Sequence, residues 1–458
     1  MKPRVALSMI VRDAELDLPR CLDSVAGLVD EIVIADTGSL DGTRAIADRY
    51  QARCLQIPWE HDFAKARNQA LAAVTADWVL ALDADEQMDP DAGELLPALL
   101  AHAEVTGYLV TIRNYVKGIN ERLWDKPATP NDFRLETARS YPAYTEHENV
   151  RLFRRHPDVY FVGRVHETVG HRITESGGRL APANFLIHHF GMVASPQTCS
   201  RKQALYQELG RLKVAEMPHS GQAHFELGLV EFDSFSNYEE ALRCFHRACE
   251  LNPKLEVSWL FAALAAIRLE RHADALRYTR GAAAHGHCGP LLLEVEGDAH
   301  FNLGNYPEAE RVYRKALKTS PEPVSLESKL GMAELRRGET ESALRRLRRT
   351  LRERRQTPEL HDRLIAALTS LGRLEEAAAA AEDKLTAIEP DETAYMRAAS
   401  IRARIGHWEK AEASVTAGLN RFPQSDKLRR ALLEVQAGSG RVPQMTGDLG
   451  HGTSAVAP

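Results

Sequence analysis

A period of 34 residues runs through the second half of the chain, and this repetition constrains the fold more than any other feature of the sequence. Alanine recurs at that interval, as does glycine, at Ala241, Ala275, Ala309, Ala343, Ala377 and Ala411 and at Gly304, Gly338, Gly372 and Gly406. Small residues also stand 12 or 13 positions before five of the alanines, at Gly228, Ala263, Gly297, Gly331 and Ala399. A unit this short cannot bury its own apolar face, so the copies must stack on one another.

The repeats are predicted to be pairs of antiparallel helices joined by tight turns, as in LGNYPEAE and IGHWEKAE. The period, with small residues where helices cross, resembles the tetratricopeptide repeat. We expect an all-α solenoid of about six repeats over residues 221–440 and a disordered tail over 441–458, which lacks apolar periodicity. Such a solenoid offers a groove to a peptide or a partner protein, and its repeats could also form a homodimer.

One helix of the predicted solenoid carries concentrated positive charge, in the run RRLRRTLRERR from Arg345 to Arg355. The run could bind an anionic acceptor, such as an acidic peptide or a lipid phosphate. Leu344, Leu347 and Leu351 already make an apolar stripe at helical spacing. The simpler interpretation of the arginines is therefore a solvated outer face.

The first 195 residues follow a different pattern, in which apolar runs that end in acids alternate with segments of helical periodicity. The stretch DWVLALDADE is an apolar run that stops at Asp83 and Asp85, and EIVIAD ends in the same way at Asp36. Runs of this kind are typical of buried parallel strands. Their alternation with helices predicts an α/β domain over residues 1–195 with a Rossmann-like, mostly parallel sheet, followed by a helical connector over 196–220.

Acids at the ends of neighbouring parallel strands meet at one edge of the sheet, where ligands of such folds bind. Asp83 and Asp85 would repel each other there, and a divalent cation that also bridges a diphosphate is the usual remedy. Asp36 would accept hydrogen bonds from the base or ribose of the same ligand. The sequence therefore predicts a nucleotide-sugar site, with the alternative that Asp36 and Asp41 are only cap and turn residues.

Composition narrows the classes of protein to which this chain can belong. A net charge of -6 with 27% charged residues argues against nucleic acid as a whole-chain partner. No stretch approaches the length of an apolar membrane span. The six cysteines show no CxxC spacing, so neither a zinc site nor a disulfide framework is implied. We expect a cytoplasmic protein, either free or peripheral at the inner face of the membrane.

The order and spacing of four segments resemble those of family 2 glycosyltransferases with the GT-A fold; the segments are MIVRDAELDLPRCLDSV, VDEIVIADTGSLDGT, DFAKARNQAL and DWVLALDADE. More narrowly, the chain resembles a bacterial branch in which tetratricopeptide repeats follow the catalytic domain. That branch includes lipopolysaccharide-core glucosyltransferase-like and peptide S-glycosyltransferase-like proteins. The resemblance implies a metal-dependent, inverting transfer from a UDP-sugar to a glycan, lipid-linked or peptide acceptor recruited by the repeats. The implied cofactor is a divalent cation, Mn²⁺ or Mg²⁺.

The resemblance also implies roles for individual residues near the first strands. Asp36 would contact the nucleoside, Asp83 the ribose side and Asp85 the metal. Glu15 stands where the family has the second of two glutamates, within the nucleotide pocket. Ala14 replaces the first of them, which removes one carboxylate from that pocket.

Two further motifs carry implied roles. Arg67 and Asn68, in FAKARN, resemble the family's pair near the phosphates, with a solvated helix face as the alternative. The family's HxGY element aligns with His189 to Met192, which makes His189 a second metal ligand beside Asp85. The alternative is a strand-end histidine that bonds backbone. A histidine beside an acid-bound cation suits manganese better than magnesium.

An inverting transfer needs a carboxylate that takes the proton of the acceptor. Glu167 is the best placed, on a predicted strand over 160–169 whose alternation puts His166 on the opposite face. Glu146 and Glu148 are rivals for this role, and Glu167 could instead pair with a neighbouring arginine.

Between 114 and 147 the strand pattern dissolves into a long loop rich in aromatic residues, prolines and asparagines. A loop of this length is usually either functional or disordered. Its rings could form an acceptor lid over the donor sugar, or merely pack within an insertion; they are Trp124, Phe133, Tyr141 and Tyr144.

Three classes of function fit parts of this sequence. A glycosyltransferase is favoured over a non-catalytic scaffold that works through its groove, because a scaffold has no need of acids at several strand ends. The residues that favour it are Asp36, Asp83, Asp85, Glu167 and His189. Nucleotidyl transfer would need a glycine-rich, basic triphosphate loop after the first strand, and RDAELDL contains no glycine.

Overall fold

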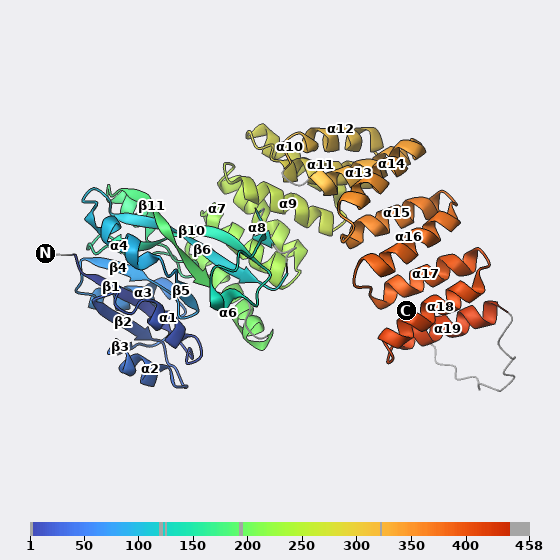
Figure 1. The fold of residues 1–458 in the computed structure, drawn as a ribbon. Helices are drawn as coiled ribbons and strands as arrows, with labels where there is room; N and C mark the ends of the chain where they lie inside the picture. The colour runs from blue at the N-terminus through green and yellow to red at the C-terminus, as the bar shows by residue number, and fades with distance from the viewer. Residues whose placement is uncertain (1–2, 119–121, 124–125, 192–195, 321–322, 440–458) are drawn as a thin grey trace, which may run out of the picture. The chain divides into compact units, whose positions relative to one another are not determined.

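The structure is a computed structural model, and it describes residues 3–118, 122–123, 126–191, 196–320 and 323–439. The chain forms two compact units, Met1–Glu270 and Arg271–Pro458, and each is described by itself (Figure 1). The predicted boundaries at 195 and 220 fall within the first unit and stay predictions. The predicted tail over 441–458 lies outside the described residues.

The first unit is built on a mixed sheet in which the described residues form nine strands. They are β1 (Val5–Val11), β2 (Glu31–Asp36), β3 (Arg53–Gln56), β4 (Trp78–Ala81), β5 (Glu86–Met88), β6 (Gly107–Val116), β9 (Thr129–Pro130), β10 (Ala143–Arg154) and β11 (Leu180–His189). The order is β3-β2-β1-β4-β10-β6-β11-β5, with β9 paired to β10. The first four strands of this row, β3, β2, β1 and β4, are parallel to one another. Strand β10 is antiparallel to both of its neighbours in the row, β4 and β6. The predicted α/β fold is confirmed, with β10 as an antiparallel insertion.

Helices cover both faces of this sheet; they are α1 (Leu18–Ser24), α2 (Thr43–Arg49), α3 (Phe63–Ala73), α4 (Ala92–Ala101) and α5 (Gly170–Glu175). Strand β1 shows why both faces need a cover: successive side chains of a strand point to opposite faces of the sheet, and those of β1 are mostly apolar on both. Leu7 and Met9 join a core with α1, α2 and α4, while Ala6 joins a second core with α3 and α5. The layers are those of a doubly wound fold.

Local signals place α3 where it can reach the carboxyl edge of the sheet. The Asp62 side chain accepts a hydrogen bond from the backbone N–H of Lys65, which caps the first turn. Ala66 and Ala70 are buried, and such small side chains let α3 lie close to β1 and β2. Arg67 is therefore carried on a buried helix beside the ends of these strands.

The segment over 160–169 is not the strand that its alternation predicted. A single isolated bridge joins Val162 to Thr168, and between them Gly163 and His166 both have positive φ, at 103° and 53°. Such residues turn the chain and leave the extended conformation. The segment is a tight loop, which we call the Glu167 loop, and strand alternation does not apply to it.

The segment over 114–147 contains more regular structure than its sequence predicted. Strand β6 continues to Val116, and β10 begins at Ala143. Short pieces lie between them: β7 (Arg122–Leu123), β8 (Lys126–Pro127), β9 and the 3₁₀ helix η1 (Glu136–Ala138). Alternation was hard to read in the sequence because polar residues occupy both faces of β10.

The rings of the predicted lid have different positions. Tyr141 and Tyr144 pack against Tyr115, with Tyr141 stacked at 5.7 Å between ring centroids. Phe133 is exposed, and Trp124 lies outside the described residues. The acceptor lid stays a prediction.

The first unit ends in helices, which are α6 (Pro196–Glu216), α7 (Gly221–Leu229), the π-helical segment η3 (Val230–Ser234), α8 (Tyr238–Leu251) and α9 (Glu256–Arg268). Glu231, in η3, is fully buried and accepts hydrogen bonds from Gln207 and Arg211 of α6. This buried acid ties α6 to the helices that follow it.

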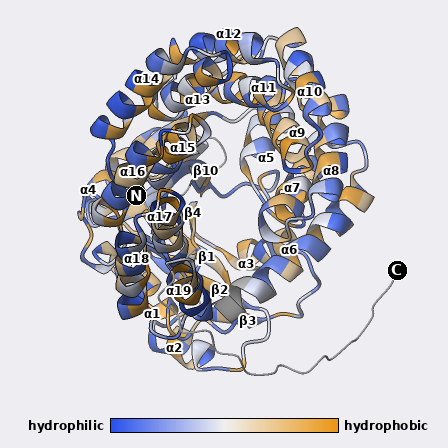
Figure 2. Ribbon diagram, turned by 90° about the vertical axis from the view of Figure 1, so that its right-hand side faces the viewer, coloured by the Kyte–Doolittle hydropathy of each residue, from blue (hydrophilic) through white to orange (hydrophobic). Residues whose placement is uncertain are grey.

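The second unit consists entirely of helices among the described residues: α10 (His272–Ala284), α11 (Pro290–Asn302), α12 (Tyr306–Leu317), α13 (Pro323–Arg336), α14 (Thr340–Glu353), α15 (Pro358–Ser370), α16 (Leu374–Ala387), α17 (Glu392–Arg404), α18 (Trp408–Arg421) and α19 (Asp426–Gly438). Figure 2 shows α11, α13, α15 and α17 on the inner side of this unit, with α12, α14 and α16 outside them. Each alanine of the 34-residue period is fully buried, as the predicted solenoid requires.

The turns between paired helices keep one geometry even where the glycine is missing. Gly304, Gly338, Gly372 and Gly406 all have positive φ, between 71° and 87°. Ser236 and Glu270 stand at the corresponding places, 34 residues apart, with φ of 51° and 58°. The repeat register therefore extends back into the first unit, although sequence alone gives no glycine there.

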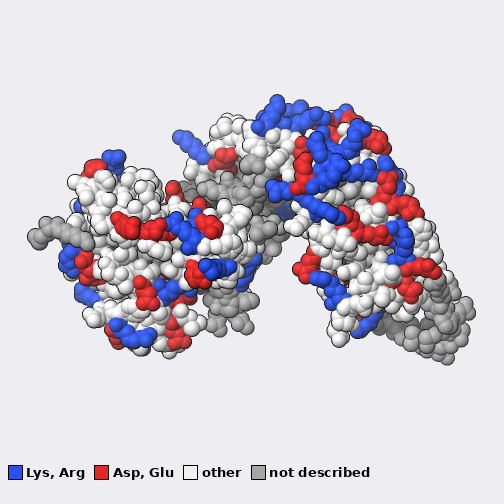
Figure 3. Space-filling view, viewed as in Figure 1, with Lys and Arg blue, Asp and Glu red and all other residues white. Residues whose placement is uncertain are grey.

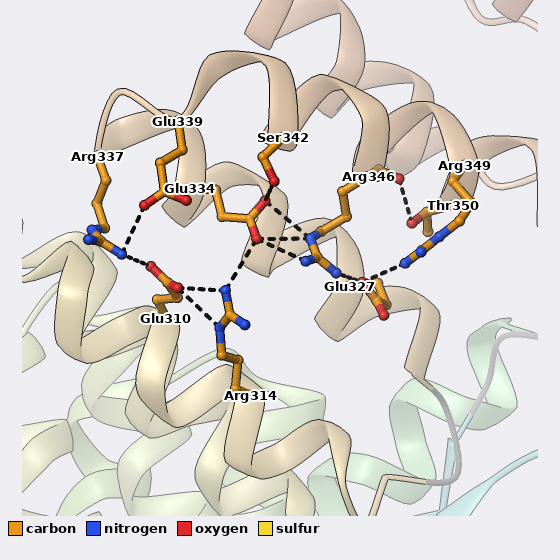
Figure 4. A network of polar contacts seen from close by, with 10 residues as sticks. All are labelled: Glu310, Arg314, Glu327, Glu334, Arg337, Glu339, Ser342, Arg346, Arg349 and Thr350. Atoms are coloured by element: carbon orange, nitrogen blue, oxygen red, sulfur yellow. Dashed lines mark hydrogen bonds and ion pairs between the residues drawn. The ribbon is translucent and has the colours of Figure 1, made fainter.

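The arginine run lies on α14 up to Glu353, and Arg354 and Arg355 follow the end of the helix. Leu344, Leu347 and Leu351 are buried, as their spacing predicted. Figure 3 shows lysine and arginine gathered on the second unit with acids among them. Arg346 binds Glu334 and Glu327, as Figure 4 shows. Much of the positive charge is therefore met by acids of neighbouring helices.

No helix among the described residues is long and apolar enough to cross a membrane. The cysteines whose side chains the structure describes are free thiols: Cys21, Cys54, Cys244, Cys249 and Cys288.

Candidate active site

A cavity of about 690 Å³ opens at the carboxyl edge of the sheet in the first unit. Its walls come from the ends of β1, β4 and β11, from one face of β10, from the Glu167 loop and from α6. Ligands of open α/β sheets bind at this edge. The predicted site residues that line it are Arg67, Asp83, Asp85, Glu167 and His189, and Tyr141, one of the rings of the predicted lid, lines it as well.

Arg67 joins two of these residues. Its guanidinium donates to Asp83 on one side and to Glu167 on the other. The side chain is buried, so the interpretation of Arg67 as part of a solvated helix face is wrong. One arginine thus fixes two carboxylates that lie 84 positions apart in the sequence, at 83 and 167.

Arg151 on β10 is a second, largely buried cation in the wall of the cavity. It donates to Glu86 at 2.7 Å and lies 3.3 Å from Asp83. Burial alone would raise the pKa of Asp83, but Arg67 and Arg151 outweigh it and lower that pKa well below its usual range. Burial raises the pKa of Glu86 to about 7, against the opposing effect of Arg151. Asp83 is therefore held as a carboxylate at the cavity wall.

His189 and Asp85 face each other across one end of the cavity. His189 Nε2 lies 3.5 Å from Asp85 Oδ1, and His189 Nδ1 lies 2.8 Å from the Asn114 side-chain oxygen. Because that oxygen can only accept, Nδ1 carries a proton and Nε2 is directed to the carboxylate. Burial would lower the pKa of His189, but its bond to Asp85 outweighs this and raises it. The ring nitrogens thus face side chains, unlike the alternative in which they bond backbone.

Gly191 keeps the space between these two groups open. A Cβ at this position would lie 2.2 Å from Asp85 Oδ2 and 2.6 Å from His189 Nε2. Any side chain would therefore fill the gap. Met192, the next residue of the aligned motif, lies outside the described residues.

The donor set at this gap fits a divalent cation that shares its shell with a ligand. A neutral imidazole with its proton on the outer nitrogen, held there by a hydrogen bond, leaves the other nitrogen free for a metal, and a carboxylate beside it is a common second ligand. Among the described residues, no group of three or more His, Cys, Asp and Glu side chains is gathered for a metal. Asp85 and His189 would leave most of the shell to phosphate oxygens and water.

Among the three carboxylates considered as the base, the cavity lining of the described residues includes Glu167 and neither rival. Glu146 binds Arg113 at 2.8 Å, and Glu148 is exposed. Alternation along β10 explains this, because it turns His147 to the cavity and its neighbours away. His166 also lines the cavity, so the prediction that it points away from Glu167 is wrong.

Asp36 and Glu15 lie beside the cavity without lining it. Asp36 is buried, and one oxygen accepts from both the backbone and the hydroxyl of Ser39. Glu15 accepts from the backbone N–H of Gly42 at 2.8 Å. Both carboxylates shape the turn after β2, where Thr37 does line the cavity. Their contacts with a nucleoside stay predictions.

Asn68 points away from the cavity. Its side-chain amide both donates to and accepts from the backbone of Phe161, at 2.9 and 2.8 Å. It therefore ties α3 to the start of the Glu167 loop. The structure does not bring Asn68 together with the other candidate residues, and its place near the phosphates stays a prediction.

Several lining residues were missed in the sequence. His147, Asn149 and Arg151 alternate along β10, a signal that the period of 2 in EHENVR could have given. Tyr206 lies on α6, outside the sheet, and no local pattern marks it. Burial raises the pKa of its phenol, and nearby Asp83 and Glu167 raise it further.

Comparison with known proteins assigns this site to a family. The model of "Glycosyl transferase family 2" matches residues 8–161. The lipopolysaccharide core biosynthesis glycosyltransferase LpsC of Rhizobium meliloti is 32% identical over 206 residues, which are 43% of this chain and 68% of that protein. The chain belongs to glycosyl transferase family 2. Within this family 2 chain, models of the tetratricopeptide repeat match residues 290–323 and 328–393.

Other relatives share shorter parts of this family 2 chain. A TPR repeat-containing protein of Synechococcus elongatus is 40% identical over 166 residues, but the match spans only 35% of its length. The glycosyltransferase SunS of Bacillus subtilis is 23% identical over 167 residues, 36% of this chain and 34% of that protein. A solved tetratricopeptide repeat protein from Parabacteroides merdae is 17% identical, with a TM-score of 0.43, and covers 52% of this chain and 94% of its own; it bears on no argument about function.

Proposed function

We propose that this family 2 chain is a metal-dependent, inverting glycosyltransferase that takes a sugar from a UDP-sugar. One observation carries the proposal: a single cavity at the carboxyl edge holds an acid and histidine pair, Asp85 and His189, together with Glu167. The first group suits a cation and a diphosphate, and the second suits the proton of an acceptor.

The chain's own residues prepare the diphosphate end. Asn114 orients the His189 ring, and Gly191 leaves room between His189 and Asp85. A bound Mn²⁺ or Mg²⁺ would neutralise the charge that develops on the departing diphosphate. Asp83, held ionised by Arg67 and Arg151, is fixed for hydrogen bonds from the ribose side of the donor.

Glu167 is positioned to accept the acceptor's proton. Glu167 lines the cavity, and its Oε1 accepts a hydrogen bond from Arg67. We propose that its second oxygen, Oε2, takes the proton of the acceptor. A positioned carboxylate of this kind contributes on the order of 10²- to 10⁴-fold to the rate.

The name of one relative supports the acceptor class that we propose. The name of the Rhizobium protein, which this chain matches over 68% of its length, supports a glycan acceptor. A lipid-linked acceptor and a peptide acceptor are the alternatives to a glycan, and assays of sugar transfer to each class would distinguish them. Recruitment of the acceptor or of a partner protein is the role that we propose for the repeats.

Thermal unfolding of the full chain with UDP and Mn²⁺ tests the donor site. We expect the two together to raise the melting temperature by several degrees, since a ligand at 100 times its Kd stabilises by about 2.7 kcal/mol. Asp85→Ala should abolish the shift, while Glu148→Gln should keep it, because Glu148 is exposed and away from the cavity. If UDP and Mn²⁺ left the melting temperature of the unaltered chain unchanged, a non-catalytic scaffold would be favoured.

Turnover tests the base. We expect Glu167→Gln to lose sugar transfer by about 10²-fold or more and to keep the UDP shift, because the amide cannot take a proton. Glu148→Gln again serves as the matched control and should transfer normally. Full transfer by Glu167→Gln would remove Glu167 from the mechanism.

A further inference from the structure

We propose that α6, which follows the sheet and lies outside the residues matched by the family model, is a working wall of the transfer site, and that Lys213 positions Glu167 through the loop that carries it. The inference rests on the proposed role of Glu167. Three independent contacts of the described residues carry it: a buried lysine, an ion pair and an aromatic ring.

The buried contact is made by Lys213. Its ammonium donates to the backbone carbonyl of Val165 at 2.9 Å and to Glu226 of α7 at 2.6 Å. Lys213 is buried, and so is Val165, which stands two residues before Glu167. A buried ammonium needs both partners, so the loop backbone is held where this cation puts it.

A second contact links the same loop to the same helix. Arg164 pairs with Glu216 of α6, with Nε at 3.1 Å from Oε2. Arg164 also donates to the carbonyl of His61 at 2.7 Å, and its own carbonyl accepts from the N–H of Phe63. The loop is therefore fastened on one side to the start of α3, which carries Arg67, and on the other side to α6.

A third contact lies inside the cavity. Tyr206 of α6 lines it, with its ring 5.8 Å from that of His166 and 6.3 Å from that of Phe63. The helix thus faces the reacting groups as well as holding the loop.

The Glu167 loop has little regular backbone pairing of its own, so side-chain contacts from α3 and α6 define it. One isolated bridge closes it, and His166 adopts a φ of 53°, which is unfavourable for a residue with a side chain. A conformation of this kind persists only where surrounding contacts impose it. Two buried cations hold the residues on either side of His166: Arg67 binds the Glu167 carboxylate, and Lys213 binds the backbone of Val165. Lys213 is therefore a positioning residue for the loop that carries Glu167.

The same contacts lead toward the repeats. Glu226, the second partner of Lys213, belongs to α7, and the buried Glu231 beyond it binds Gln207 and Arg211 of α6. Lys213 thus joins the backbone of the Glu167 loop directly to α7, the first helix of the repeat register. A change at α7 would reach Glu167 through Lys213.

Lys213→Met in the full chain tests the proposal, because methionine keeps the apolar stem and removes the ammonium. We expect kcat for sugar transfer to fall about tenfold or more, since small misplacements of a catalytic group are costly. The KM for the donor should stay within about twofold, because Asp85 and His189 are untouched. Amide hydrogen exchange over residues 162–168 should become faster.

Arg211→Met is the matched control. Arg211 lies two residues from Lys213 on the same helix and binds the buried Glu231, but it makes no contact with the Glu167 loop. We expect its kcat to stay within about twofold of the unaltered chain. An equal loss in both variants would show a general loosening of α6 and would overturn the proposal.

Should Lys213→Met fail to fold, Arg164→Met tests the second contact, at a more exposed site. It should lower kcat about threefold and speed amide exchange in the same segment. Unchanged kcat and unchanged exchange in the variant that folds would overturn the positioning role. Absence of transfer and of a UDP shift in the unaltered chain would instead overturn the proposed function, while amide exchange would still report on the loop.

Discussion

The two units both contain networks of arginine and carboxylate, and one pair from each shows opposite burial. At the cavity the arginine of the pair is the more buried partner: the Arg67 side chain is 5% exposed and that of Asp83 is 35% exposed. In the Glu334 network of the second unit the acid is the buried partner, with Glu334 at 1% and Arg314 at 53% (Figure 4). The group left in the open is the one that can meet a ligand.

This difference gives the two networks different consequences for function. Buried arginines hold Asp83 and Glu167 toward empty space, as a site for a cation and an acceptor proton requires. The buried Glu334 instead joins Arg346 and Arg314 from neighbouring helices, so it serves packing between repeats. Removing one partner of a buried pair is costly in either case, but only the first network should also affect catalysis.

The largest effect is expected from Arg67→Met. It leaves Asp83 and Glu167 close together without the cation between them. We expect the free energy of unfolding to fall by about 3 kcal/mol and sugar transfer to fall on the order of 10²-fold. Urea unfolding and initial rates measure the two. Transfer at the normal rate would mean that the cavity network, like that of the repeats, is only structural.

A pair of glycine substitutions separates the two regions. Gly191→Ala puts a Cβ between Asp85 and His189, so we expect transfer to fall about 10- to 100-fold with little loss of stability. Gly297→Ala puts a Cβ 2.3 Å from the Tyr313 ring, so we expect about 1–3 kcal/mol less stability with normal transfer. Thermal unfolding and rates on both variants check this. If both variants lost transfer, or both lost only stability, the division between a catalytic first unit and a structural second unit would be wrong.

Arg346→Met should affect stability alone. It deprives the buried Glu334 of its hydrogen bond at 2.9 Å and leaves Arg314 at 3.6 Å. We expect about 2 kcal/mol less stability in urea unfolding, because a buried acid loses its partner. The neighbouring Arg345→Met is the control and should change nothing, since Arg345 is exposed. A loss of UDP binding in Arg346→Met would contradict the separation of roles.

The smallest effect is expected at the rim of the same network. Glu339 pairs with Arg337 at 3.2 Å, and both side chains are well exposed. Glu339→Gln should change the free energy of unfolding by less than about 0.5 kcal/mol, because water and side-chain entropy offset an exposed pair. Urea unfolding checks it, and a change above 1 kcal/mol would show that the rim is coupled to the buried acid.

What could be read from the sequence was local or periodic. The 34-residue spacing predicted the solenoid, and the acid-tipped apolar runs predicted the sheet and two residues that line the cavity, Asp83 and Asp85, whereas His189 came from the family resemblance. These predictions succeed because, within a single helix or strand, the spacing of apolar residues follows the face that is buried. The strand over 160–169 failed for the same reason, because a positive φ at His166 breaks the period that the prediction relied on.

The sequence by itself therefore determined the two fold classes and the acids that follow strands, since hydrophobic spacing dictates both. Only the tertiary structure decided which groups meet: Arg67 with Glu167, Asn114 with His189, and Lys213 with Val165. These partners lie 100, 75 and 48 positions apart. A buried charge or ring must be satisfied by whatever polar group packing brings within 3 Å, and no local pattern records that choice.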